Sequence, residues 1–167
     1  AFDDLRFGHQ LGMESIEVVD GYDPMMYARC VKTDAEIELL KRATTVNEQA
    51  IRRSIKTWGP GMMWQEFNHE YHKAVVEMGG FVRDPGAMVW GHPCGGDPAV
   101  TLHSRLDDFV MEPGMNILFD CHGTLDLYCW DGGKTWVVDG DATGDAKQYA
   151  NATADAATAV MEAMRPG

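Results

Sequence analysis

Two short apolar runs joined by a polar segment constrain this chain more than any other feature. Residues 117–119 (ILF) lead into Asp120, and Asp131 lies shortly before the run at residues 134–138 (KTWVV). Both runs are rich in β-branched and aromatic residues, which favour strands. The sequence therefore predicts two adjacent strands, each with an aspartate near the segment that connects them.

The connecting segment predicts a register for this strand pair. Gly123 and Asp126 suit a turn, so we expect an antiparallel hairpin that closes near Leu125, with Asp120 opposite Asp131. Opposed residues point to the same face of a sheet, with Cβ atoms roughly 5 Å apart. Two ionised carboxylates at that separation repel each other unless one is protonated or a cation lies between them. A pair of metal ions about 3.5–4 Å apart suits this position, whereas acidic residues at strand ends often only contact water.

The hairpin and its approach resemble the pita-bread metallohydrolases, which include aminopeptidase P, prolidase, methionine aminopeptidase and creatinase. In that family the first two metal ligands are aspartates on neighbouring strands, spaced as are Asp120 and Asp131, which have ten residues between them. Residues 113–114 (PG) match the family's turn before the first strand. Residues 132–135 (GGKT) match its small residue, base and Thr after the second aspartate, with Lys134 where prolidase-type peptidases usually carry Arg.

The resemblance implies an α+β fold, the first half of a pita-bread domain in which helices cover an antiparallel sheet. Residues 33–167 would form this half of the catalytic domain, with the second half absent. Residues 1–32 would comprise the remnant of an N-terminal domain, with a short strand at residues 16–19, and a linker at residues 20–32 in which Pro24 blocks regular structure.

Helical patterns support this arrangement. A capping box at residues 33–36 (TDAE) predicts the start of a long helix that ends before residues 59–61 (GPG). A second helix is predicted from about Met63 to Met78, and an Ala-rich third helix from Asp145. The predicted apolar stripes are Leu39, Ala43, Val46 and Ala50 in the first helix and Phe67, Tyr71, Ala74 and Met78 in the second. The third helix is predicted to run through Tyr149, Ala152, Ala156, Val160 and Met164.

The resemblance also implies the site residues. Asp120 and Asp131 would hold two divalent ions, with Asp131 bridging them, and manganese, cobalt, zinc and iron all suit such ligands. The family's other ligands, one His and two Glu, belong to the absent half. His103, which lies 17 residues before Asp120, is expected to line the substrate pocket and hydrogen-bond the substrate carbonyl. His92 is a second candidate for that role.

His122 departs from the family pattern, because the peptidases usually carry Gly two positions after the first aspartate. The period of two along a strand places His122 on the same face as Asp120. It would be an extra metal ligand, a plug that narrows the pocket, or a strand-end histidine turned to solvent.

The function implied is a dinuclear-metal hydrolase of the Xaa-Pro peptidase type, which cleaves an amide bond with a metal-bridging water. Two alternatives stay open. One is a non-peptidase of the same fold that resembles creatinase, ectoine hydrolases or dimethylsulfoniopropionate lyases. The other is a non-catalytic pita-bread binding domain.

Composition narrows the partners and the compartment. A net charge of -12 argues against a nucleic-acid partner, and no apolar run approaches the roughly 20 residues that cross a bilayer. Four cysteines without a CxxC pair, and no visible signal peptide, suggest reduced thiols in a cytoplasmic protein. We expect a small peptide or small-molecule substrate and a homodimer.

Two other motifs point away from competing functions. His69 and His72 mimic a zinc-protease motif but are three residues apart rather than four, so we interpret them as a solvated helix face. The glycines at residues 91–96 do not follow the spacing of a phosphate-binding loop.

A lone half of this fold would leave its sheet partly uncovered. We therefore expect these residues to belong to a larger polypeptide or assembly. We also expect an exposed apolar surface around Ile117, Phe119, Tyr128 and Trp130.

Overall fold

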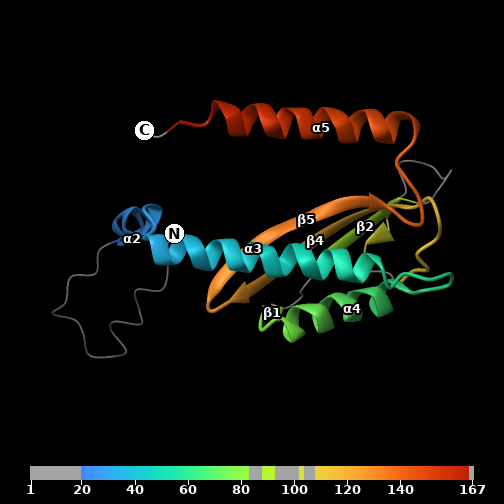
Figure 1. The fold of residues 1–167 in the computed structure, drawn as a ribbon, viewed down its shortest axis with the longest axis horizontal. Helices are drawn as coiled ribbons and strands as arrows, with labels where there is room; N and C mark the ends of the chain where they lie inside the picture. The colour runs from blue at the N-terminus through green and yellow to red at the C-terminus, as the bar shows by residue number, and fades with distance from the viewer. Residues whose placement is uncertain (1–19, 83–87, 93–101, 104–107, 166–167) are drawn as a thin grey trace. The chain divides into compact units, whose positions relative to one another are not determined.

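The computed structural model describes residues 20–82, 88–92, 102–103 and 108–165 (Figure 1). The chain divides into two compact units, which meet between Ile37 and Glu38. The predicted division into an N-terminal remnant and a catalytic half, placed at residues 32 and 33, stays a prediction. The predicted strand at residues 16–19 lies outside the described residues.

The first unit contains helix α2, Tyr22–Cys30, where we had predicted an irregular linker. That prediction is wrong because Pro24 lies in the first turn of the helix. The backbone N–H groups of a first turn have no partner within the helix, so proline removes nothing there. None of the residues in α2 is buried.

Helix α3, Asp34–Ile55, begins at the predicted capping box. The backbone N–H of Thr33 donates to Glu36 Oε2 at 2.7 Å, and the Glu36 N–H donates back to Thr33 Oγ1 at 3.3 Å. Three of the four residues of its predicted apolar stripe are buried, namely Ala43, Val46 and Ala50. The start and the buried face of this helix are therefore confirmed.

Helix α4, Trp64–Glu77, also matches its prediction, with Phe67, Tyr71 and Ala74 buried. The helix ends where Gly79 adopts a φ of 82°, a left-handed conformation that glycine adopts without strain. The N–H of Gly80 then donates to the carbonyl of Val75 at 3.0 Å.

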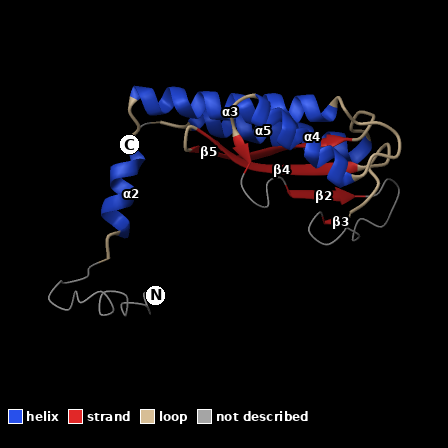
Figure 2. Ribbon diagram, turned by 90° about the horizontal axis from the view of Figure 1, so that it is seen from below, coloured by secondary structure: helices blue, strands red, loops and turns tan. Residues whose placement is uncertain are grey.

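The sheet is antiparallel and is built around strand β4, Asn116–Leu125 (Figure 2). Strand β5, Tyr128–Val137, pairs with one edge of β4. The other edge pairs with β2, Met88–His92, and, further along, with β1, Phe81–Val82. Strand β3, Leu102–His103, pairs with β2. The predicted α+β class with an antiparallel sheet is confirmed.

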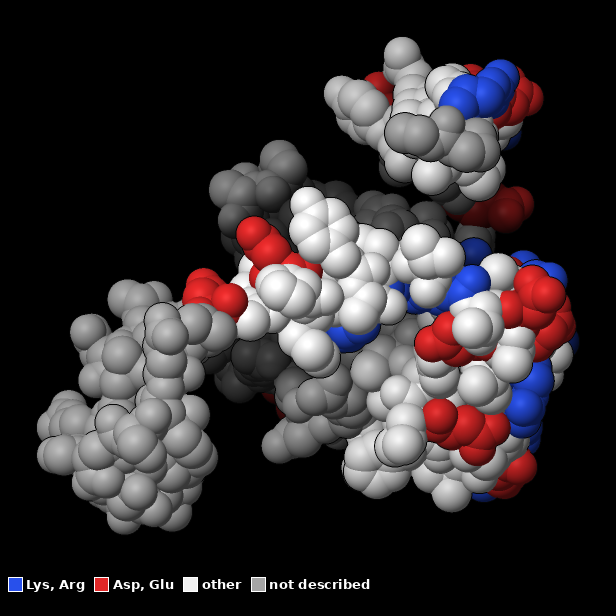
Figure 3. All heavy atoms as spheres, turned by 90° about the vertical axis from the view of Figure 1, so that its left-hand side faces the viewer, with Lys and Arg blue, Asp and Glu red and all other residues white. Residues whose placement is uncertain are grey.

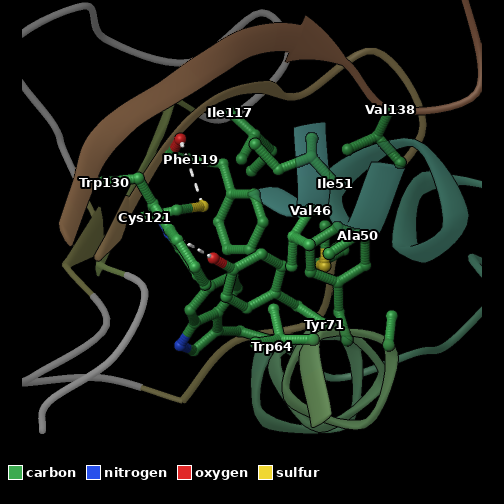
Figure 4. Close-up of a cluster of buried hydrophobic side chains, with 14 of the residues drawn as sticks. Val46, Ala50, Ile51, Trp64, Tyr71, Ile117, Phe119, Cys121, Trp130 and Val138 are labelled. Atoms are coloured by element: carbon green, nitrogen blue, oxygen red, sulfur yellow. Dashed lines mark hydrogen bonds between the residues drawn. The ribbon is translucent and has the colours of Figure 1, made fainter. Parts of the chain in front are cut away.

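Helices α3 and α4 cover one face of this sheet (Figure 2). Alternate residues of β4, among them Ile117, Phe119 and Cys121, are buried against the helices (Figure 4). Trp130 of β5 joins them at 6% exposure, and Tyr128 is half-buried. The predicted exposed apolar surface around these residues is therefore wrong, because they point toward the helices and not toward the open face.

The predicted third helix forms as α5, Gly144–Ala163, but none of its residues is buried. Tyr149, Val160 and Met164 are all more than half exposed. The predicted helix is therefore confirmed, and its apolar side chains are exposed.

Candidate metal centre

The hairpin closes one position later than we predicted. Asp126 and Leu127 form a two-residue loop with φ values of 48° and 69°. Two successive positive φ values suit a hairpin turn whose twist matches that of the strands. His122 consequently lies opposite Asp131, and Asp120 lies opposite Gly133. The predicted pairing of Asp120 with Asp131 is wrong by two residues.

Gly123 explains the error. We interpreted it as a turn residue, but it lies inside β4, opposite Trp130. A Cβ atom at Gly123 would come within 2.2 Å of the Trp130 ring. Glycine is therefore needed here because the indole crosses the backbone, and not because the chain turns.

A shift of two residues leaves every side chain on its original face, because the side-chain period of a strand is two. Asp120, His122 and Asp131 therefore still share the face of the sheet that α3 and α4 do not cover. His122 Nδ1 lies 3.2 Å from Asp131 Oδ1, and His122 Nε2 lies 4.0 Å from Asp120 Oδ2. The imidazole ring thus lies between the two carboxylates.

The three side chains have the chemistry and spacing of metal ligands. One donor atom from each lies within 4.8 Å of the others. The side chains of Asp120 and His122 are 29% and 27% exposed, whereas that of Asp131 is 82% exposed. These three residues are therefore candidate ligands for a divalent ion that is reached from the open face.

Space for a ligand lies beside Asp120. A hollow of about 350 Å³ is lined there by Leu118, Asp120, Gly133, Thr135 and their neighbours. A Cβ atom on Gly133 would lie 1.8 Å from the carbonyl oxygen of Phe119, so only glycine allows the two strands to approach this closely.

Lys134 points away from this cluster, toward α3. Its Nζ lies 3.6 Å from Glu48 Oε1, and Arg52 contacts the same carboxylate at 2.9 Å. The hydrogen bond from Arg52 and the positive charge of Lys134 hold the pKa of Glu48 below its usual range. Lys134 therefore ties the hairpin to a helix and is not one of the clustered donors.

His103 and His92 are described through their backbone pairing. His103 pairs with Trp90, which pairs in turn with Leu118, two residues before Asp120 on β4. His92 pairs with Asn116. Both histidines thus belong to strands of the same sheet, and their predicted roles in the substrate pocket stay predictions.

Two groups with reactive chemistry lie on the opposite, buried face. Burial raises the pKa of the Cys121 thiol and of the Tyr71 phenol, so both stay protonated at neutral pH. Sequence reasoning missed Asn47, which is buried next to Tyr71 and accepts its hydrogen bond at 2.9 Å. The available signal was a polar residue within the apolar stripe of α3.

His69 and His72 do not join a metal cluster in the part of the chain that the structure describes. His69 is exposed, as predicted for a solvated face. His72 is half-buried, and its Nε2 lacks a hydrogen-bond partner. Burial first, and the nearby His69 second, lower the pKa of His72.

Comparison with known proteins identifies the family. Residues 38–167 match metallopeptidase family M24. The chain belongs to this family. Human Xaa-Pro dipeptidase is 27% identical over 143 residues, which are 83% of this chain and 28% of that protein. The rat Xaa-Pro dipeptidase is 26% identical over the same shares of the two chains. The chain thus spans less than a third of the length of these relatives.

Solved structures of M24 proteins share the fold. A variant of Escherichia coli aminopeptidase P superposes with a TM-score of 0.77 at 22% identity, over 99% of this chain and 37% of that one. The prolidase from Pyrococcus horikoshii gives 0.75 at 17% identity, over 99% and 47%. The predicted pita-bread fold is confirmed.

Acidic and basic side chains are interspersed over the described part of the face shown in Figure 3. Within the described segments, no helix has both the length and the apolar character that a membrane span requires.

Proposed function

We propose that this M24 chain contributes Asp120 and Asp131 to a divalent-metal site that hydrolyses Xaa-Pro peptide bonds. The observation that supports it most directly is the cluster of two carboxylates and an imidazole, with donor atoms within 4.8 Å of one another. Similarity to human and rat Xaa-Pro dipeptidases supports the substrate class.

Each residue has a distinct role in this proposal. Asp120, on the central strand, is a half-buried carboxylate ligand. Asp131, on the edge strand, is largely exposed and would be the ligand that two ions share. When bound, the ions would supply Lewis acidity to a substrate carbonyl and a water. His103 orients the substrate carbonyl from the far side of β2, with His92 as the second candidate.

Metal analysis of the full-length protein tests this site. After loading with Mn²⁺ and desalting, Asp131→Ala should retain at least one equivalent fewer than the wild type. Loss of a hydrogen bond that supports a metal ligand lowers activity by about 10–100-fold. The rate of Xaa-Pro dipeptide hydrolysis should fall further than this in Asp131→Ala, because the ligand itself is removed. An unchanged metal content in Asp131→Ala would contradict the bridging role.

His122 favours a second candidate function, a non-peptidase reaction on the same fold. His122 Nδ1 lies 3.2 Å from Asp131 Oδ1. The ring thus occupies space beside this carboxylate that a substrate or an ion would otherwise fill. As a third ligand or as a plug, it would restrict the site to small substrates such as quaternary ammonium or sulfonium compounds.

Parallel assays separate the two functions. The Mn²⁺-loaded protein is offered Xaa-Pro dipeptides and small quaternary or sulfonium substrates, with His122→Gly beside the wild type. A peptidase should cleave the dipeptides, and His122→Gly should retain or increase that activity. Turnover of only the small cationic substrates, lost in His122→Gly, would favour the second function. The metal identity and a homodimeric state stay predictions.

A further inference from the structure

A ring of hydrogen bonds encloses the backbone of Asp131 from the buried side of the sheet. Trp130 Nε1 donates to Tyr71 Oη at 3.2 Å, a contact visible in Figure 4. Tyr71 Oη donates to Asn47 Oδ1 at 2.9 Å, and Asn47 Nδ2 donates to the carbonyl of Gly132, also at 2.9 Å. The chain of bonds begins at the residue before Asp131 and ends at the residue after it.

The donors and acceptors of this ring are complementary. The indole N–H can only donate, so the Tyr71 hydroxyl accepts from it, and the Tyr71 hydroxyl donates in turn to Asn47 Oδ1. The amide oxygen of Asn47 is then an acceptor, and its NH₂ group faces the Gly132 carbonyl. A buried network in which every member is satisfied holds one arrangement, since any other leaves a buried polar group unpaired.

The three side chains of the ring come from three different elements. Asn47 belongs to α3 and is 7% exposed, Tyr71 belongs to α4 and is 0% exposed, and Trp130 belongs to β5 and is 6% exposed. Within the described sheet β5 pairs with β4, and these side chains, together with Lys134, connect β5 to the helices. Asp131 points in the opposite direction, into the donor cluster.

We propose that Asn47 is a positioning residue for the metal site. With Tyr71 and Trp130 it clamps the backbone on both sides of Asp131 and so sets the distance of that carboxylate from Asp120 and His122. This inference rests on the proposed function, because it concerns the same ligands. Asn47 itself lies behind the sheet and does not contact the cluster.

Co²⁺ binding by the full-length protein tests the clamp. Asn47→Leu removes the amide at similar size, and Asp131→Asn weakens the ligand that the clamp serves. Ser54→Ala is the matched control. Ser54 is also buried in α3, and its hydroxyl bonds the Ala50 carbonyl of the same helix at 2.8 Å. The measurements are the Kd by calorimetry, the visible absorption of bound Co²⁺, and the thermal midpoint.

Asn47→Leu should weaken Co²⁺ binding by about 10-fold and shift the visible band, as changes to groups that orient metal ligands do. Ser54→Ala should lower the thermal midpoint and leave both the Kd and the band unchanged. In the Asp131→Asn background, Asn47→Leu should cause no further loss. This non-additivity identifies an effect that acts through Asp131 and not through general stability.

Two results would overturn the clamp alone. In the first, Co²⁺ binding depends on Asp131, but Asn47→Leu leaves the Kd and the visible band at their wild-type values. In the second, Asn47→Leu weakens Co²⁺ binding as much in the Asp131→Asn background as in the wild type. If Asn47→Leu does not fold, Tyr71→Phe, which removes one hydroxyl, decides by the same criteria with a smaller loss expected. Wild-type protein whose Co²⁺ binding does not depend on Asp131 would overturn the proposed function and, with it, this inference.

Discussion

The two faces of the β4–β5 hairpin are built from alternate residues of the same strands, yet they differ in almost every property. On the face toward α3 and α4, Phe119 and Cys121 are fully buried. The polar groups of Asn47, Tyr71 and Trp130 on this face form hydrogen bonds with one another. On the other face, Leu118 is 44% exposed, and Asp120 and His122 retain access to solvent.

This difference separates stability from ligand binding within one hairpin. The covered face contributes apolar contact area and a fixed backbone, so substitutions there should mainly lower the free energy of unfolding. The open face holds solvent-accessible carboxylates and an imidazole, so substitutions there should mainly change what the protein binds. Matched pairs of neighbouring residues can test this separation.

The largest expected effect is at Phe119, whose ring lies 5.1–5.5 Å from those of Trp64, Phe67 and Tyr71. Phe119→Ala should lower the free energy of unfolding by about 3–5 kcal/mol, measured by urea denaturation. Its neighbour Leu118 is the control, since Leu118→Ala on the open face should cost about 1 kcal/mol. Equal losses at the two positions would contradict the proposed division between the faces.

A smaller loss is expected for Gly123→Ala. The added methyl group would come within 2.2 Å of the Trp130 ring, and crowding of this kind costs about 1–3 kcal/mol. Gly132→Ala is the matched control, because a Cβ there meets no atom within 4 Å. If both variants unfold at the same urea concentration, the close approach of the indole does not constrain this strand.

The covering helices should also carry an acid-sensitive group, His72 in α4. Its pKa is lowered in the folded protein, mainly by burial, so the unfolded chain takes up the proton first as the pH falls. The contribution of His72 to the free energy of unfolding is therefore fully present above its ordinary pKa of about 6.5 and is lost as the pH falls below that value. His72→Gln should flatten the fall in thermal midpoint between pH 7 and pH 5, whereas His69→Gln should flatten it less, because His69 is only the second cause of the lowered pKa.

The smallest change in stability is expected at Asp131, because its side chain is 82% exposed. Asp131→Asn changes one largely exposed contact with His122 and should alter the free energy of unfolding by at most about 1 kcal/mol. The same variant should nevertheless bind Co²⁺ less tightly. A large loss of stability with unchanged metal binding would reverse the roles assigned to the two faces.

Helices α3, α4 and α5 and the shared face of Asp120, His122 and Asp131 could be predicted from the sequence because they depend on local rules. A capping box and an apolar stripe specify α3 without reference to the rest of the chain. The period of two placed Asp120, His122 and Asp131 on one face, and this survived a register error because the error was even. The prediction at Pro24 was wrong because the effect of a proline depends on its position within a helix, and Pro24 lies in the first turn of α2.

Tertiary structure decided the register of the β4–β5 hairpin, the function of Gly123 and the hydrogen bonds of Asn47. Each depends on atoms that are distant in the sequence, such as the Trp130 indole over Gly123 or the Asn47 amide beneath Gly132, 85 residues away. A periodic pattern reports which way a side chain points, but not which partner it meets. Hydrogen bonds and close packing require specific atoms at about 3–4 Å, and only the folded chain brings those atoms together.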